Sequence, residues 1–221
     1  MNNKIDDLTK GQQEQQRDMK KLLEQITWIN ATLEEEANKG KTSQNWTTIL
    51  RRFDGSVDFY RGWSEYRQGF GNPPNGEFFI GLEKLHELTT TTAIVELKII
   101  LRNWLGEERY AIYSAFQIAD QSEKYKIKKL GEYSGTAGDF LSYNRGLQFS
   151  TYDADNDNSR GNCAEALMGA WWFGDCSESH LFGPYNTKRE SETGGIAWFH
   201  WKYTSRYSFK YAEMLIKATL V

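Results

Sequence analysis

The chain is poor in the residues that build metal clusters and basic surfaces. It has two cysteines, three histidines and three prolines in 221 residues. Two cysteines without paired histidines do not make a zinc pattern, and no apolar run approaches the roughly 18 residues that a membrane span needs. Lys and Arg number 27 against 30 Asp and Glu, for a net charge of -3. Because the basic residues are dispersed, no nucleic-acid partner is expected.

The same scarcity argues against catalysis. The histidines, His86, His180 and His200, are scattered among strands and turns. No serine or cysteine nucleophile motif accompanies them. His180 is interpreted as a surface or core residue. The sequence therefore predicts a binding protein rather than an enzyme.

The first forty residues carry an unbroken heptad pattern. Apolar or glutamine residues recur at alternating steps of three and four, at Ile5, Leu8, Gln12, Gln15, Met19, Leu22, Ile26, Ile29 and Leu33. This pattern predicts a coiled coil over residues 1–40, and isoleucine at adjoining a and d positions favours a homotrimer. A single amphipathic helix lying on its own domain is the alternative. Residues 41–44 are expected to be a linker.

From residue 45 the pattern changes to short strands separated by turns. TTILRRF and VDFYRGW flank an Asp-Gly turn, and YKIKKL is a further strand. AIVELKIILRNW and RYAIYSAFQIA are strongly β-prone and are expected to pair antiparallel. From Tyr133 onward glycine, aspartate, asparagine and aromatics dominate, which predicts a part held by loops, a disulfide and a metal. Residues 45–221 are thus expected to form one substantial domain.

Three aspartates at alternate positions, Asp153, Asp155 and Asp157, mark an acidic stretch. In an extended or turning backbone their side chains crowd together and repel unless a cation such as Ca²⁺ lies between them. The glycine and glutamate that an EF-hand requires are not at the matching positions. A site with Asp155 and Asp157 carboxylates, backbone carbonyls and water remains open, because Ser159 and Gly161 continue the alternation. An Asx-rich surface turn without metal is the alternative.

The two cysteines, Cys163 and Cys176, follow this acidic stretch closely. A short-range disulfide fits them best. In the chain-entropy account it contributes on the order of 3 kcal/mol, and it indicates an oxidising compartment. Two buried thiols are the alternative.

Five strings of the sequence resemble one known family. They are WTTILRRFDGSVDFYRGW, NGEFFIGLEKLHELT, YSGTAGDFLSYNRGLQFSTYDADND, GNCAEALMGAWWFGDC and the late WFHW. Together they resemble the fibrinogen C-terminal domain family, which includes ficolins, tachylectins, angiopoietins and tenascin tails. The resemblance runs from about Asn45 to Lys217. It implies an α+β fold in which a twisted antiparallel sheet carries a loop-rich subdomain for calcium and ligand.

The resemblance also assigns roles to the acidic stretch and the cysteines. In that family two aspartate side chains and two following backbone carbonyls hold calcium, and these correspond here to Asp155, Asp157, Ser159 and Gly161. The family's disulfide corresponds to Cys163 with Cys176. It is usually preceded by a cis peptide, which here is the Asp175-Cys176 bond.

The resemblance further places a ligand pocket beside the second cysteine. Members that bind acetyl groups line it with an aromatic residue, a histidine and a tyrosine, and Leu167, Ser177 and Glu192 stand at those places here. The polar and aromatic clamp that gives sugar specificity is therefore missing. Trp171 and Trp172 are expected to pack behind the pocket or to be purely structural. The expected pocket comprises Leu167, Trp172, Phe173, Asp175, Cys176, Ser177 and Glu192.

A second departure concerns the front of the domain. The cysteine-bearing first segment of the family is missing, and the chain enters directly from the heptads at Asn45-Trp46-Thr47. Its loss removes strands that cover one side of the sheet, so we expect an exposed sheet edge or a less stable domain, unless the helical arm replaces those strands.

The expected compartment is extracellular. No apolar secretory signal follows Met1, but the disulfide, the calcium site and the family all indicate secretion. Sequons at Asn30 and Asn45 are compatible with a glycoprotein. We interpret the chain as a secreted protein whose start is truncated.

Two functions are compatible with these features. The first is a calcium-dependent, multivalent lectin-like module of the innate-immunity type, in which oligomerisation raises avidity for glycans or microbial surfaces. The second is a receptor-binding or adhesion ligand that contacts a cell-surface protein. Oligomerisation and the family favour the first, which is the prediction. The missing sugar clamp favours the second, which is the alternative.

Overall fold

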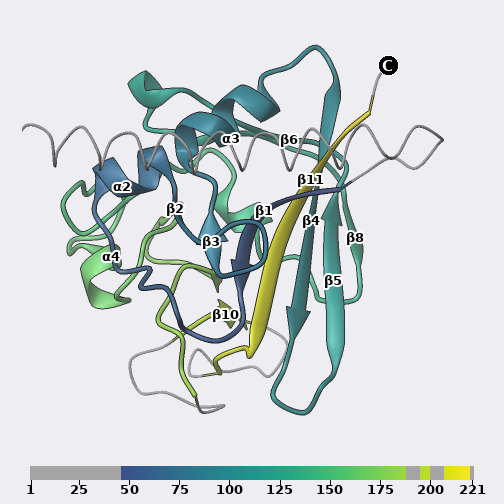
Figure 1. Cartoon of the computed structure of the whole chain (residues 1–221). Coiled ribbons are helices and arrows are strands. Elements are labelled where there is room, and N and C mark those ends of the chain that lie inside the picture. The colour runs from purple at the N-terminus through teal and green to yellow at the C-terminus, as the bar shows by residue number, and fades with distance from the viewer. Residues whose placement is uncertain (1–45, 188–194, 200–206, 220–221) are drawn as a thin grey trace, which may run out of the picture. The chain divides into compact units, whose positions relative to one another are not determined.

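The structure is a computed structural model, and it describes residues 46–187, 195–199 and 207–219 (Figure 1). The predicted coiled coil, the linker and the homotrimer contact therefore concern residues outside the described ranges. The helices are α2 (Trp63–Gln68), α3 (Leu82–Thr89), α4 (Cys163–Ala166) and the short 3₁₀ turns η1 (Gln121–Glu123) and η2 (Ser142–Asn144). The strands are β1 (Thr47–Arg52), β2 (Phe70–Gly71), β3 (Phe78–Phe79), β4 (Ile94–Arg102), β5 (Glu108–Tyr113), β6 (Phe116–Ile118), β7 (Ile127–Leu130), β8 (Tyr133–Gly135), β9 (Ser179–His180), β10 (Ala197–Trp198) and β11 (Tyr211–Thr219).

One seven-stranded sheet, in the order β2-β3-β1-β11-β4-β5-β8, is the centre of the domain. Every pairing in it is antiparallel. The predicted pairing of the two β-prone segments is confirmed, because β4 pairs with β5 from Leu97↔Tyr113 to Arg102↔Glu108. The late strand β11 lies between β1 and β4, so segments from both ends of the domain meet in the middle of the sheet (Figure 1).

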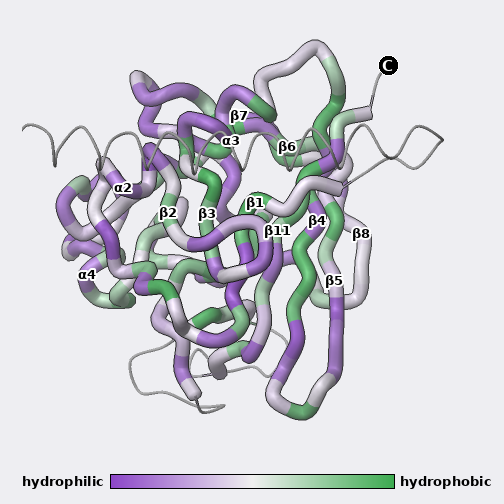
Figure 2. The backbone as a smooth tube through the Cα atoms, in the orientation of Figure 1, coloured by the Kyte–Doolittle hydropathy of each residue, from purple (hydrophilic) through white to green (hydrophobic). Residues whose placement is uncertain are grey.

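The sheet forms because its long strands alternate between buried and exposed positions. In β4 the residues Val95, Leu97, Ile99 and Leu101 are buried, and the residues between them are half-buried or exposed. Such a period of two gives the strand one face for the core and one for solvent. Figure 2 shows the hydrophobic colour along β3 and the middle of β4.

Aromatic rings fill the space between the sheet and the loop-rich part of the domain. Tyr66 of α2 lies within 5.2 to 5.8 Å, between ring centroids, of Phe79, Phe149 and Phe182. These rings come from segments far apart in sequence and are all fully or almost fully buried. The loops that carry the acidic stretch are therefore built on a rigid aromatic core.

The segment VDFYRGW is not a strand, and here the sequence prediction is wrong. It is an irregular stretch that leads into α2 at Trp63. The buried carboxylate of Glu77 accepts hydrogen bonds from the Val57 amide, at the start of this stretch, and from the amides of the preceding turn, Phe53, Asp54 and Gly55. Within the stretch the Tyr60 amide donates to the Asp58 carboxylate and the Arg61 amide to the Phe59 carbonyl, so these donors are satisfied without strand pairing.

The expected open edge at the front of the domain is also wrong. β1 is an interior strand, since it pairs with β3 on one side and with β11 on the other. The strands that end the sheet are β2, of two residues, and β8, of three. Such short edges offer little backbone to another chain. Among the described helices, none has the length and apolar character to cross a membrane.

Candidate functional site

The acidic stretch begins with a tight turn that directs Asp153 away from the other aspartates. Thr151 and Ala154 exchange two backbone hydrogen bonds of 3.0 and 3.1 Å across this turn. The Asp153 carboxylate accepts hydrogen bonds from the Trp63 amide, at 2.8 Å, and from the Thr151 hydroxyl, at 2.6 Å. The expectation that three aspartates crowd together is therefore wrong, because the first of them caps the start of α2. In the described ranges, no group of three or more His, Cys, Asp or Glu side chains is arranged to hold a metal.

Asp155 and Asp157 remain together, as the two-carboxylate pattern requires. The Asp155 carboxylate accepts the Asp157 amide at 3.2 Å. The two oxygens of Asp157 accept the amides of Ser159 and Cys163, each at 2.9 Å. These successive bonds fold the backbone around Asp157 and fix its side chain.

Burial raises the pKa of the Asp157 carboxyl above its usual value, and the negative Asp155 beside it raises it further. The hydrogen bonds from the Cys163 and Ser159 amides lower this pKa, but they offset the rise only in part. A raised pKa means that the ionised form of the carboxyl is destabilised by its surroundings. A cation next to Asp155 and Asp157 would remove that cost, so the donor set fits a hard, oxygen-preferring ion.

The remaining two predicted ligands, Ser159 and Gly161, follow in the same loop. Ser159 is half-buried and Gly161 is exposed, with no other atom within 4 Å of the position of a Cβ atom. Open space on this side leaves room for carbonyl oxygens and water to complete a coordination shell. The residues present are therefore compatible with calcium, which stays a prediction for this chain.

A disulfide joins Cys163 to Cys176 with an S–S distance of 2.11 Å and a Cα–Cα distance of 5.5 Å. The disulfide predicted from the sequence is thus formed. Its loop closes against the acidic stretch, because the Asn158 amide donates to the Gly174 carbonyl at 3.0 Å. Since Cys163 also donates its amide to Asp157, the disulfide holds one wall of the candidate calcium loop in place.

The peptide bond before the second cysteine is trans. In the described part of the chain the cis bond joins Pro73 to Pro74. The expected cis bond between Asp175 and Cys176 is therefore wrong. A non-proline cis bond costs about 3 to 4 kcal/mol, so trans is the ordinary outcome.

Comparison with known proteins decides the family. The sequence model of the fibrinogen beta and gamma chains, C-terminal globular domain, matches residues 6–219. The chain belongs to the fibrinogen C-terminal domain family. The match begins within the segment whose heptads predict a coiled coil, and it includes the whole of the described domain.

Curated relatives of this fibrinogen-like chain are found in several vertebrates. It is 43% identical to tenascin of Gallus gallus over 172 residues, which is 78% of this chain and 9% of tenascin. It is 42% identical to angiopoietin-2 of Homo sapiens over 192 residues, which is 86% of this chain and 37% of the relative. The chain therefore spans well under half the length of these two relatives.

Solved structures show the same fibrinogen-like globe. The globe domain of human ANGPTL2 superposes with a TM-score of 0.74 at 38% identity, and covers 78% of this chain and 79% of that one. Lamprey fibrin D-dimer, complexed with the peptide Gly-His-Arg-Pro-amide, gives a TM-score of 0.73 at 33% identity. It covers 80% of this chain and 62% of that chain. The predicted α+β fold with an antiparallel sheet is confirmed.

The fibrinogen-like pocket predicted beside Cys176 is only partly accessible. Trp172 and Phe173 are fully buried, and the Trp172 indole donates to the Tyr125 carbonyl at 2.7 Å. Their assignment as ligand-contacting residues is wrong, because neighbouring core side chains cover them completely. Leu167, Cys176 and Ser177 are half-buried, and Asp175 is exposed. Glu192 lies outside the described residues, and the fully buried Trp171 belongs to the core.

Polar groups around Ser177 are engaged within the protein. Its hydroxyl donates to the Ser179 carbonyl at 2.7 Å and accepts from the Asn144 side-chain amide at 2.9 Å. The exposed Tyr143, which sequence reasoning missed, accepts the Asp175 amide on its hydroxyl at 3.2 Å. The serine at this place is thus a structural link, and it does not supply a free sugar-binding group.

His180 is a core histidine in β9, in agreement with one of its two expected roles. It is 4% exposed and packs edge-on against Phe173, with ring centroids 5.2 Å apart. Burial lowers the pKa of its imidazole to about 3, and the positive Arg52 nearby adds to that effect. Because it is buried, this imidazole offers almost no surface to a ligand.

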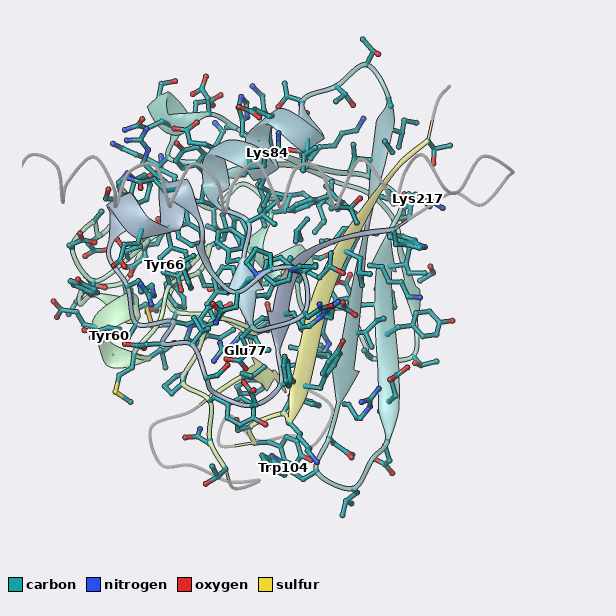
Figure 3. The ribbon with its side chains drawn as sticks, in the orientation of Figure 1. Tyr60, Tyr66, Glu77, Lys84, Trp104 and Lys217 are labelled. Carbon is teal, nitrogen blue, oxygen red and sulfur yellow. A yellow bond between two sulfur atoms is a disulfide. The ribbon has the colours of Figure 1, made fainter. Side chains whose placement is uncertain are left out.

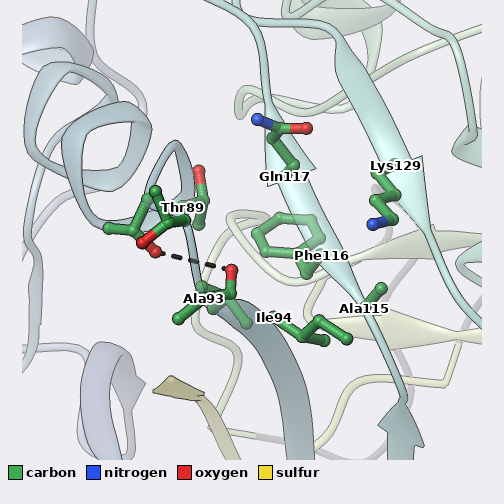
Figure 4. Close-up of a pocket in the computed structure, with 10 residues that line it drawn as sticks. Thr89, Ala93, Ile94, Ala115, Phe116, Gln117 and Lys129 are labelled. Atoms are coloured by element: carbon green, nitrogen blue, oxygen red, sulfur yellow. Dashed lines mark hydrogen bonds between the residues drawn. The ribbon is translucent and has the colours of Figure 1, made fainter. Parts of the chain in front are cut away.

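A small hollow of about 140 Å³ lies away from the acidic loop, between the end of α3, the start of β4 and the β6–β7 hairpin (Figure 4). Its lining includes Thr89, Thr92, Ile94, Gln117 and Lys129. None of the predicted site residues within the described ranges contributes to it. It is too small for a drug-sized ligand.

Proposed function

We propose that this chain is an extracellular recognition module that binds a protein partner, as a receptor-binding or adhesion ligand does. The observation that carries the proposal is the state of the expected sugar pocket. Leu167 and Ser177 stand where acetyl-binding members have an aromatic residue and a histidine, and Trp172 and Phe173 are fully buried. A sugar site needs accessible aromatic faces and free polar groups, which these residues do not offer.

The relatives support the same choice. The similarity to angiopoietin-2 and tenascin favours a ligand or adhesion role over a lectin role. The lamprey fibrin structure carries a peptide ligand. The disulfide supports an oxidising, extracellular setting. Nothing in this family membership suggests a reaction, so we propose binding without catalysis.

Calcium enters the proposal as a structural ion held by Asp155 and Asp157, with Ser159 and Gly161 supplying carbonyl oxygens. Its charge would neutralise the two carboxylates and let their loop pack against the disulfide. In this account calcium stabilises the recognition surface rather than contacting a substrate.

A glycan array tests the choice between the two functions. The purified full chain is applied to acetylated and non-acetylated glycans, once in calcium and once in chelator. The proposal predicts no capture above background in either condition. Calcium-dependent capture by a defined class of glycan would overturn it in favour of the lectin-like, innate-immunity alternative.

A further inference from the structure

Two exposed tyrosines pack against each other in a tilted arrangement beside the acidic loop. Tyr60 and Tyr152 are 41% and 38% exposed, and their ring centroids are 4.9 Å apart with an interplanar angle of 45°. In the described part of the domain neither hydroxyl hydrogen-bonds to the protein. Figure 3 shows Tyr60 projecting outward at the edge of the domain. We call these two side chains the tyrosine pair.

Each ring is presented by a backbone turn that its neighbours fix. The Tyr60 amide donates to the Asp58 carboxylate at 2.9 Å, and the next amide, of Arg61, donates to the Phe59 carbonyl at 3.0 Å. Tyr152 lies in the turn whose ends, Thr151 and Ala154, exchange two backbone hydrogen bonds. A surface ordered in advance loses less conformational entropy when a partner binds.

The two turns are also tied to each other and to the candidate calcium loop. Asp153, which follows Tyr152, accepts the Trp63 amide at 2.8 Å. Gly62 permits this approach, since a Cβ atom there would lie 2.6 Å from an Asp153 carboxylate oxygen. On the other side the side-chain amide of Asn162 donates to the Tyr152 carbonyl at 3.0 Å and links it to the start of α4. The distance between the rings is therefore set by packing and hydrogen bonds.

Acidic side chains lie close in sequence to both members of the tyrosine pair. Asp58 and Asp153 are exposed and lie within two residues of the paired rings. The nearby cation, Arg61, is engaged elsewhere, because it donates to the Asp58 carbonyl, pairs with Glu65 and stacks over the ring of Phe70. Tyrosine faces attract cations, and adjacent carboxylates strengthen that attraction.

We propose that the tyrosine pair docks a protein partner by receiving an arginine or lysine side chain from it. This inference rests on the proposed function, and it names the surface and the chemistry of the partner. Exposed aromatic residues on a rigid base are typical anchors of protein interfaces. A guanidinium or ammonium group lying on the two rings, with Asp58 and Asp153 beside it, satisfies both the aromatic and the ionic preferences of the surface.

The test uses the full chain with labelled tyrosines and follows their ring signals by NMR. The chain is titrated with acetyl-Gly-Arg-Gly-amide and, separately, with the peptide in which neutral citrulline replaces arginine. We expect the Tyr60 and Tyr152 signals to shift saturably with the arginine peptide, and the citrulline peptide to bind at least about fivefold more weakly. Equal binding of the two peptides, or no saturable shift, would overturn the proposal.

Matched variants show whether the rings are responsible. Tyr60→Leu and Tyr152→Leu are each expected to weaken binding of the arginine peptide about fivefold, whereas Tyr60→Phe, which keeps the ring, retains it. Tyr143→Leu is the control, because that side chain is 43% exposed and lies beside Cys176 instead. Equal loss in Tyr143→Leu would contradict the assignment. Gly62→Ala, which separates the turns while keeping both tyrosines, gives a second route to the same loss.

The outcome is separable from that of the proposed function. If the chain binds cells through a protein and Tyr60→Leu leaves this binding unchanged, the tyrosine pair is not the docking surface and the proposed function stands. If binding needs a glycan, the proposed function fails whatever the peptide titration shows.

Discussion

At the scale of single residues, two aspartates of the acidic stretch have different roles. Asp153 is committed to the Trp63 amide and the Thr151 hydroxyl, whereas Asp157 is partly buried beside Asp155 with a raised pKa. The same residue type therefore has a structural role at one place and a candidate metal-binding role four residues later. The alternating sequence pattern alone does not distinguish these two roles.

The first prediction concerns calcium. At a calcium concentration a hundredfold above Kd, binding stabilises the fold by about 2.7 kcal/mol, which raises Tm by roughly 5 to 10 °C. Asp157→Ala is expected to abolish this rise, because it removes a carboxylate from the site. Melting curves in calcium and in chelator measure it.

The matched control for that experiment is Asp153→Ala. Loss of the two hydrogen bonds of Asp153 should lower Tm both in calcium and in chelator, but calcium should still raise Tm by the same amount. If the unchanged protein melts at the same temperature with calcium and with chelator, the calcium site is wrong. If Asp153→Ala also abolishes the rise in Tm caused by calcium, the assignment of different roles to Asp153 and Asp157 is wrong.

A second residue-scale prediction concerns pH. The pKa of His180 is about 3 in the folded state, below its ordinary value of 6.5. As the pH falls below about 6.5, the unfolded chain therefore binds a proton that the folded chain does not. The contribution of neutral His180 to the free energy of unfolding is therefore fully present above about pH 6.5 and decreases as the pH falls towards 3. His180→Gln should flatten the decline in denaturation free energy between pH 6 and 4, measured in chelator, and an unchanged slope would contradict this role.

At the scale of elements, β1 is fixed to the loop-rich part of the domain by one buried arginine. Arg52 is 1% exposed, donates to the carbonyls of Leu181 and Gly183 at 3.1 and 2.8 Å, and lies 3.8 Å from the ring centroid of Phe59. Glu77, whose carboxylate accepts the backbone amides of the loop after β1, lies 3.9 Å from the Arg52 guanidinium. This cluster joins the sheet to the segment that follows the disulfide.

We predict that Arg52→Lys destabilises the domain by about 3 kcal/mol or more, because a shorter ammonium group cannot both reach the two carbonyls that Nη1 contacts and replace the planar guanidinium over Phe59 in a dry site. Arg102→Ala is the control, since its ion pair with Glu108 is about half exposed on both sides. Such surface pairs contribute about 0 to 1 kcal/mol. Urea denaturation of the two variants measures the difference, and a cost for Arg52→Lys as small as that for Arg102→Ala would contradict this role.

The disulfide gives a further prediction at the element scale. Replacing Cys163 and Cys176 together by serine should lower the free energy of unfolding by about 3 kcal/mol. It should also weaken calcium binding, because the amide of Cys163 holds the Asp157 carboxylate. Denaturant unfolding and calcium titration calorimetry measure the two effects. Unchanged calcium affinity in the double variant would show that the loop keeps its shape without the bond.

How far these elements were predictable depends on how local their causes are. The strands β1, β4, β5, β6 and β7 all overlap segments that are predicted as strands, because their β-prone residues and flanking turns are local features of the sequence. RYAIYSAFQIA, predicted as one strand, contains β6 and nearly all of β5. The helix α3 was missed, although Leu82 and Leu85 are spaced one turn apart. The irregular conformation at the start of VDFYRGW depends on Glu77, which lies about twenty residues away in the sequence and accepts the Val57 amide. No local sequence pattern indicates such a partner.

The candidate site divides in the same way. Asp155, Asp157 and the disulfide came from local spacing and from resemblance to a family. The burial of Trp172 and Phe173 did not, since it depends on rings such as Phe149 and Phe116 that come from other segments. The tyrosine pair was missed for the same reason, because 92 positions separate Tyr60 from Tyr152 in the sequence.

At the scale of the whole molecule, oligomerisation remains a prediction from the heptads of residues 1–40. We expect sedimentation equilibrium to give three times the chain mass for the full protein and one chain mass after deletion of those residues. A trimer would present three recognition surfaces at once and raise avidity for a partner on a surface. A monomeric full chain would reject the coiled-coil interpretation.

Binding to intact cells distinguishes a fibrinogen-like domain that recognises protein from one that recognises sugar. The labelled full chain is applied in calcium to cells that bind it, after treatment either with trypsin or with glycosidases that strip surface glycans. We predict that trypsin removes the binding and that glycan removal leaves it within about twofold. Binding that survives trypsin and disappears with the glycans would contradict protein recognition.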